Sequence, residues 1–215
     1  MIKNCIRMDF LTSMPYLTKK NMIIFVLAAV WSEIVTKEAT IMGMLAIFYS
    51  MMNLLTLFAI EEQNGTNFLC GTLPIKRSDV VKGRYLFSLL FCFGATVGSV
   101  AFSSLFALVF FSSFTLMAFF KVLIYHGLFM FSSFLAMAVQ MPILFHVGYQ
   151  KGKTIAWIAA IIPAMMTVVF SKLKNTAMVE RIPIGQKTLF LVGGITVIML
   201  ASYSLAKKKY LAKDF

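Results

Sequence analysis

The sequence predicts an all-α integral membrane protein, and two observations predict it: the composition and the spacing of apolar runs. The 215 residues are 60% hydrophobic and only 13% charged, whereas soluble domains are roughly 45–50% apolar. The apolar runs are each near the roughly 20 residues that a helix needs to cross a hydrocarbon core of about 30 Å. Lipid offers the backbone no hydrogen-bond partner and the alternation of a β-barrel is missing, so we expect helices.

The apolar runs predict six transmembrane helices in one domain, residues 1–215. The runs cover residues 16–36, 40–60, 85–110, 116–145, 154–171 and 188–206. We divide the third run from the fourth at a short outer turn near 111–115, and we expect a kink at Pro163 inside the fifth. The first run starts late and no small-residue cleavage site follows it, so we expect a retained span rather than a signal peptide.

The segment 1–18 precedes the first span and has the pattern of an interfacial amphipathic helix. Ile2, Ile6 and Phe10 supply apolar surface, while Lys3 and Arg7 supply charge. Such a helix lies in the headgroup plane of the membrane. We expect it to end at Pro15, and we expect the first span to end near Glu33 in a small external loop.

The distribution of basic residues predicts that both termini are cytoplasmic, because loops rich in Lys and Arg stay inside. This N-in, C-in arrangement places fourteen of the twenty basic residues inside. Four others lie between residues 172 and 187, which the same arrangement places outside, so this segment fits the topology least well. The net charge of +12 is explained by contact with anionic headgroups, and no nucleic-acid partner is needed.

The block 61–84 is the most polar part of the chain and is expected to be a cytoplasmic loop. A helix of about twenty residues from Thr40 leaves the bilayer near Ile60, so residues 61–64 form an extra turn. Gly65 then permits a turn, and Ser78-Asp79 is a favourable helix start. Leu69 and Leu73 share one face of a short helix that Pro74 closes. This elbow has the proportions of a docking element for a soluble partner, and a simple connector is the alternative.

The chain carries no convincing catalytic, cofactor-binding or metal-ligating set. The second expected inner loop, 146–153, resembles a phosphate-binding loop, but only three residues stand between its glycines where that motif has four. Glu61-Glu62 lacks the Arg that follows the paired glutamates of intramembrane proteases, since Thr66 stands there. Neither the two histidines nor the three cysteines have metal or redox spacing. We therefore expect no enzyme activity in this chain.

Ionisable groups within spans usually indicate an ion or proton path. Glu33 and Lys121 both fall near expected outer ends, and only His126 lies deeper. We interpret His126 as a packed, hydrogen-bonded polar residue. A self-sufficient secondary transporter or channel, which would more typically bury carboxylates, remains the alternative function.

Two polar segments carry a resemblance to a known family. The run Glu61-Glu62-x-x-Gly65-Thr66, followed by Leu73-Pro74-x-x-Arg77-x-Asp79-Val80-Val81-x-Gly83-Arg84-Tyr85, resembles the first cytoplasmic loop of small bacterial ABC-2-type permeases. The segment Gly148-Tyr149-x-Lys151-Gly152-Lys153 resembles their second inner loop. Within the family, the chain is similar to permeases that export phenol-soluble modulins, which are small amphipathic peptides.

The resemblance implies a bacterial cell-membrane permease that works with a separate ABC ATPase. Two permease copies or paralogues would form the membrane core, and the substrate would be hydrophobic or amphipathic. The first inner loop would contact the ATPase through a set of nine residues. They are Glu61, Glu62, Gly65, Thr66, Phe68, Leu69, Leu73, Pro74 and Arg77. Phe68 to Leu73 would seat in the ATPase groove, and the two glutamates would face its surface.

Overall fold

The computed structural model describes residues 2–16, 19–36, 41–65, 76–110, 115–159, 161, 165 and 184–212. Every regular element in these ranges is helical, and none of them is a strand. The elements are α1 (Ile2–Ser13), a short 3₁₀ helix (Met14–Tyr16), α2 (Lys19–Thr36), α3 (Ile41–Gln63), α5 (Arg77–Phe110), α6 (Leu116–Ala159) and α9 (Ile184–Leu211).

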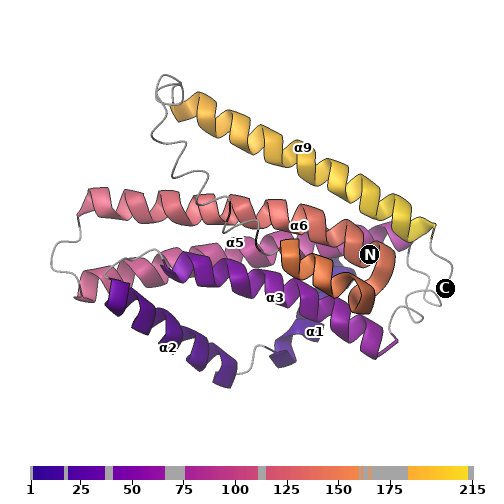
Figure 1. Cartoon of the computed structure of the whole chain (residues 1–215), viewed down its shortest axis with the longest axis horizontal. Coiled ribbons are helices and arrows are strands. Elements are labelled where there is room, and N and C mark those ends of the chain that lie inside the picture. Colours follow the sequence, from indigo (N-terminus) through magenta and orange to yellow (C-terminus); the bar gives the residue numbers. More distant parts are fainter. Residues whose placement is uncertain are drawn as a thin grey trace.

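The long helices lie side by side in a bundle (Figure 1). Helix α6 packs against α3, α5 and α9, and α1 packs mainly against α5. Helix α9 lies along one edge of the bundle and α2 along the other, where α2 contacts α3. The hydrophobic core is shared by α3, α5, α6 and α9. It includes Leu54, Tyr85, Met141 and Ala206, which are all buried.

Helix α6 is a helical hairpin with its reversal at Gly148. That residue has φ 79° and ψ 178°, which interrupts the helix. The Gln140 side-chain amide donates a 2.8 Å hydrogen bond to the Ala156 carbonyl oxygen, sixteen residues further on. In a straight helix those residues would be roughly 24 Å apart, so the arm after Gly148 folds back along the arm before it.

Three of the described helices are long and apolar enough to cross a membrane: Met42–Gln63, Arg77–Phe110 and Leu116–Ala159. Together with the composition they confirm the prediction of an all-α membrane protein. The number of six spans and the N-in, C-in orientation stay predictions. Residues 1–18, expected to form an interfacial helix, contain α1 and the 3₁₀ turn, in which Pro15 lies.

Several boundaries agree with the sequence-based expectations. Helix α3 continues through Glu61 and Glu62 as the extra turn, and Gly65 adopts φ 63°. Helix α5 begins at Arg77, one residue before the expected Ser78. Helix α5 ends at Phe110 and α6 begins at Leu116, and Thr115 Oγ1 accepts a 3.3 Å hydrogen bond from the Ala118 amide in the first turn of α6. Residues 111–114 of the expected outer turn lie outside the described residues.

Two local expectations differ from the structure. Residues 146–153, expected to form a loop, are helical except at Gly148, because a single left-handed glycine is enough to reverse the chain. Glu33, expected near an external loop, is fully buried inside α2, where it finds hydrogen-bond donors on α3 and α5. Thr66, residues 68–74, Pro163 and residues 172–183 lie outside the described residues, so the expectations for them stay predictions.

Candidate functional site

The candidate site is a buried ion-pair cluster at the end of the bundle where the polar block 61–84 begins and ends. Arg84 on α5 is its centre. Its Nη2 donates to Asp9 Oδ1 of α1 at 3.0 Å, and its Nη1 donates to Glu61 Oε2 of α3. All three side chains are buried. One guanidinium therefore joins three helices that are distant in the sequence.

Aromatic rings complete the surroundings of Arg84. The Arg84 Cζ lies 4.6 Å from the centre of the Phe58 ring and 5.9 Å from that of Phe145. The two rings meet edge to face at 5.0 Å. A guanidinium is well suited to this place because it donates to carboxylates in its plane while its faces stack on rings. Phe145 adds α6 to the helices that the cluster joins.

Close approach of α1 to α5 brings Asp9 within reach of Arg84. Gly83 faces Cys5, and a Cβ atom at Gly83 would lie only 2.7 Å from the Cys5 Cβ. Asp9 lies four residues after Cys5 on the same face of α1. The absent side chain at Gly83 thus sets the distance between the helices, and the ion pair follows one turn further along α1.

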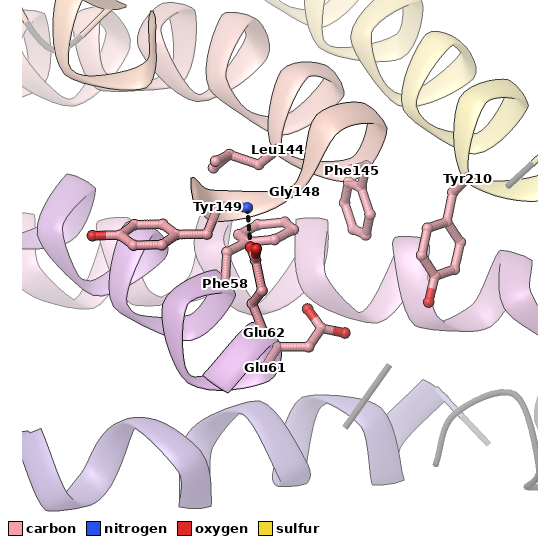
Figure 2. Close-up of a pocket in the computed structure, with 8 residues that line it drawn as sticks. All are labelled: Phe58, Glu61, Glu62, Leu144, Phe145, Gly148, Tyr149 and Tyr210. Atoms are coloured by element: carbon pink, nitrogen blue, oxygen red, sulfur yellow. Dashed lines mark hydrogen bonds between the residues drawn. The ribbon is translucent and has the colours of Figure 1, made fainter. Parts of the chain in front are cut away.

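Glu62 makes a second connection, between the end of α3 and the second arm of α6. Its Oε2 accepts hydrogen bonds from the backbone amides of Tyr149, at 2.6 Å, and Gln150, at 3.1 Å. These are the first amides after the break at Gly148, so the carboxylate caps a helix start and sits at its positive end. Figure 2 shows Glu62 pointing at this turn, beside Glu61.

Gly148 is required at this turn for two reasons. Its φ of 79° is in the left-handed region that glycine favours, and an added Cβ would lie 3.2 Å from Glu62 Oε2. The space that Glu61, Glu62, Gly148 and Tyr149 help to line has a volume of only about 10 Å³, which is room for about one water molecule. This end of the bundle is therefore a contact between helices rather than a pocket for a ligand. We call the contact formed by Asp9, Glu61, Glu62, Arg84 and Gly148 the joint.

The structure brings together only part of the predicted contact set. Glu61 and Glu62 lie at the joint, Gly65 follows in a turn and Arg77 opens α5. The remaining five members, Thr66, Phe68, Leu69, Leu73 and Pro74, lie outside the described residues. Glu62 is exposed while Glu61 is buried. The two glutamates therefore have different surroundings, although we expected the same role for both from the sequence.

Sequence reasoning missed Arg84, Asp9 and Gly148 as parts of this site, and it noted Arg84 only within the family motif. Asp9 is the only acid in residues 1–18. It lies on the face of α1 that carries Cys5 and Ser13, which are both buried. An acid on a buried face needs a buried cation as its partner. Gly148 was noticed within a glycine-containing segment. Its left-handed conformation has no signature beyond the residue type itself.

A second buried polar cluster lies away from this joint and joins α2, α3, α5 and α6. Glu33 Oε1 accepts hydrogen bonds from Ser103 Oγ at 2.9 Å and from the Met42 amide at 3.4 Å. Ser103 Oγ lies 3.5 Å from His126 Nε2, and His126 Nδ1 donates to the Val122 carbonyl oxygen at 2.8 Å. His126 is thus a packed, hydrogen-bonded residue, as interpreted from the sequence, with a glutamate in its network.

The chemistry available in these clusters is that of structural ion pairs and hydrogen bonds. Among the described residues, no group of three His, Cys, Asp or Glu side chains is arranged to hold a metal ion. Cys5 and Cys92 are buried free thiols. Burial, followed by the nearby charges of Asp9 and Asp79, raises the pKa of the Cys5 thiol, which makes it a poor nucleophile.

Comparison with known proteins gives one finding. A family described as "ABC-2 family transporter protein" matches residues 5–210. This range includes the joint, the polar block, helices α2, α3, α5 and α6, and α9 except Leu211. No curated protein and no solved structure matches significantly.

Proposed function

Because this chain belongs to the ABC-2 transporter family and is a membrane permease of an ABC transporter, we propose that it couples an ATPase to export through the block 61–84. The ATPase is a separate subunit that binds the permease at the cytoplasmic side. Phe68 to Leu73 provide the apolar contact with the ATPase. When the ATPase moves this contact, the end of α3 at Glu61–Gly65 and the start of α5 at Arg77 move with it. The substrate is hydrophobic or amphipathic, and two permease copies or paralogues form the membrane core.

This proposal rests on one observation: both ends of the block 61–84 are bound to the helix bundle through ion pairs and hydrogen bonds. Glu61, at the end of α3, pairs with Arg84, which lies two turns into α5. Glu62 binds the amides that start the second arm of α6. A displacement of the block 61–84 therefore moves α3 and α5 together, and it also moves the second arm of α6, which ends at Ala159. Asp9 extends the same connection to α1.

The burial of Glu61 refines the role proposed for the two glutamates. A carboxylate held by a buried guanidinium has little freedom to bind a second basic group, whereas Glu62 is exposed. We assign Glu61 to holding the loop ends together. Glu62 lies at the protein surface, where it caps Tyr149 and is accessible to the ATPase.

The test is affinity purification of the tagged full chain from its native membrane, followed by mass spectrometry. The proposal expects an ABC ATPase to be recovered in stoichiometric amounts. Leu69→Asp is expected to abolish its recovery. Leu211→Asp, at an exposed apolar residue of α9, is the matched control and should leave recovery unchanged. Recovery of the ATPase with the Leu69→Asp variant at the wild-type level would contradict the proposed contact.

A further inference from the structure

A groove runs between α1 and α5 and is distinct from the joint at Arg84. Its volume is about 670 Å³. Its walls are apolar except for Lys3 and Arg7 of α1 and the hydroxyl group of Tyr49. The lining residues are Lys3, Ile6, Arg7, Phe10, Tyr49, Phe87, Leu90, Phe91, Gly94 and Ala95. None of these is acidic.

The α1 wall is one face of the helix. Lys3, Ile6, Arg7 and Phe10 follow the spacing i, i+3, i+4, i+7, which places them in a single stripe. Lys3 and Arg7 are exposed, so their charged ends are accessible. The α1 wall therefore presents two cations above an apolar surface.

The α5 wall is also a single face of its helix, and it is apolar. Phe87, Leu90 and Phe91 begin it, and Phe91 contacts Tyr49 of α3 with ring centres 6.0 Å apart. Gly94 leaves the far end open, because a Cβ added there meets nothing within 4 Å. Gly94 is ten residues beyond Arg84, or roughly 15 Å along the helix. The groove thus combines two cations on α1 with an apolar face of α5 that reaches about 15 Å beyond Arg84, which is about the thickness of the hydrocarbon of one leaflet.

We propose that this groove binds an anionic phospholipid, with its phosphate at Lys3 and Arg7 and the upper part of an acyl chain along Phe87 to Gly94. The groove matches the two parts of a lipid molecule. The cations lie on α1, which is amphipathic like an interfacial helix, and the apolar surface lies on α5, which is long enough to cross the membrane. Two cations with no lining acid favour a lipid with net negative charge over a zwitterionic one.

A second copy of the chain fits this face less well. A symmetric dimer contact places the same patch of each subunit against the other. Lys3 and Arg7 of one subunit would then approach the same cations of its partner, which is unfavourable at an interface with no lining acid. The bound lipid instead holds α1 to α5 through the stripe from Lys3 to Phe10, beside the stripe of α1 that carries Cys5 and Asp9.

The test is native mass spectrometry of the purified full chain, titrated with phosphatidylglycerol and, separately, with phosphatidylcholine. Wild type should bind one phosphatidylglycerol at least ten-fold more tightly than phosphatidylcholine. Replacing both cations, Lys3→Gln with Arg7→Gln, should weaken phosphatidylglycerol roughly ten-fold or more, since each basic residue near an anionic surface contributes about 1 kcal/mol.

Gly94→Leu fills the groove without a clash and should reduce binding of both lipids. Gly98→Leu is the matched control: it lies one turn further along α5, also has nothing within 4 Å of an added Cβ, and does not line the groove. Equal affinities for the two lipids would overturn the proposal. So would equal phosphatidylglycerol binding by the Gly94→Leu and Gly98→Leu variants, or a dimer in wild type that Gly94→Leu alone dissociates. Lipid binding is measured without an ATPase, so its failure leaves the proposed coupling function standing.

Discussion

Arg84 of α5 and Asp9 of α1 form a buried ion pair at 3.0 Å, across 75 positions of the sequence. The same guanidinium also pairs with Glu61 of α3. A buried ion pair is weak evidence of net stabilisation, since desolvation of the charges offsets their attraction. We infer that its effect is to position α1, because among the described residues Arg84 is the cation that pairs with Asp9. The pair therefore fixes the lead-in against the two helices that flank the polar block.

Removal of the cation should be far more damaging than removal of a nearby surface charge. Arg84→Met leaves the buried carboxylates of Asp9 and Glu61 without their cation, which we expect to cost about 3–5 kcal/mol of folding free energy. Lys82→Met, at an exposed position on the same helix, should change stability little. The measurement is unfolding of the purified protein in mixed micelles with increasing SDS. Equal destabilisation by the two substitutions would show that the cluster does not hold the bundle.

The thiol of Cys5 reports directly on the docking of α1. Cys5 is buried against Gly83, and burial together with Asp9 and Asp79 raises its pKa. Alkylation requires the thiolate, so maleimide labelling of Cys5 should be slow at neutral pH and should accelerate at a higher pH than for an ordinary thiol. In Arg84→Met, α1 is released and labelling at neutral pH should become faster. Peptide mapping distinguishes Cys5 from the other two cysteines.

Addition of one methyl group at the reversal of α6 should disturb its cap. Gly148→Ala puts a side chain on a backbone at φ 79° and ψ 178°, a conformation that essentially only glycine adopts, which costs about 1–3 kcal/mol. The added Cβ also crowds Glu62 Oε2 at 3.2 Å. Gly127→Ala on the same helix is the control, because its Cβ meets nothing within 4 Å and alanine is a better helix former. We expect Gly148→Ala to unfold at lower SDS than wild type, and Gly127→Ala to match or exceed wild type.

In the second buried cluster, around Glu33, we expect the hydrogen-bond acceptor at residue 33 to matter more for stability than its negative charge. Glu33 Oε1 accepts from Ser103 and from the Met42 amide. Glu33→Gln keeps a carbonyl oxygen for these donors, whereas Glu33→Leu leaves them buried without an acceptor, at a cost of about 1–3 kcal/mol. The same unfolding assay should rank the variants with Gln near wild type and Leu well below. The reverse order would mean that the negative charge itself is required.

The general form of this protein was predictable because hydrophobic content and helix boundaries follow from local sequence. The extra turn of α3 at Glu61, the turn at Gly65 and the start of α5 at Arg77 all depend on residues within a few positions of each boundary. The partners of Glu61 and Glu62 were not predictable in the same way. Arg84 is 23 residues from Glu61 and Tyr149 is 87 from Glu62, and a single sequence does not state which distant groups meet.

Glu33 shows a related limit. A glutamate near the end of an apolar run has the pattern of a residue at the membrane surface. Its burial depends on Ser103, seventy residues later, and on the contact between His126 and Gly43, where an added Cβ would lie 2.8 Å from the imidazole Cδ2. Small residues on facing helices permit this approach. Their significance is evident only once the helices are packed.

The most direct test of the coupling proposal measures binding and activation separately. The wild-type chain and two variants are reconstituted with the co-purified ATPase, and both ATPase association and permease-stimulated ATP hydrolysis are measured. Leu69→Asp should lose both, because it removes the proposed contact. Glu62→Ala should retain association yet lose most of the stimulation, because it releases the second arm of α6 from α3. Wild-type stimulation in Glu62→Ala, with Leu69→Asp still bound, would contradict coupling through the block 61–84.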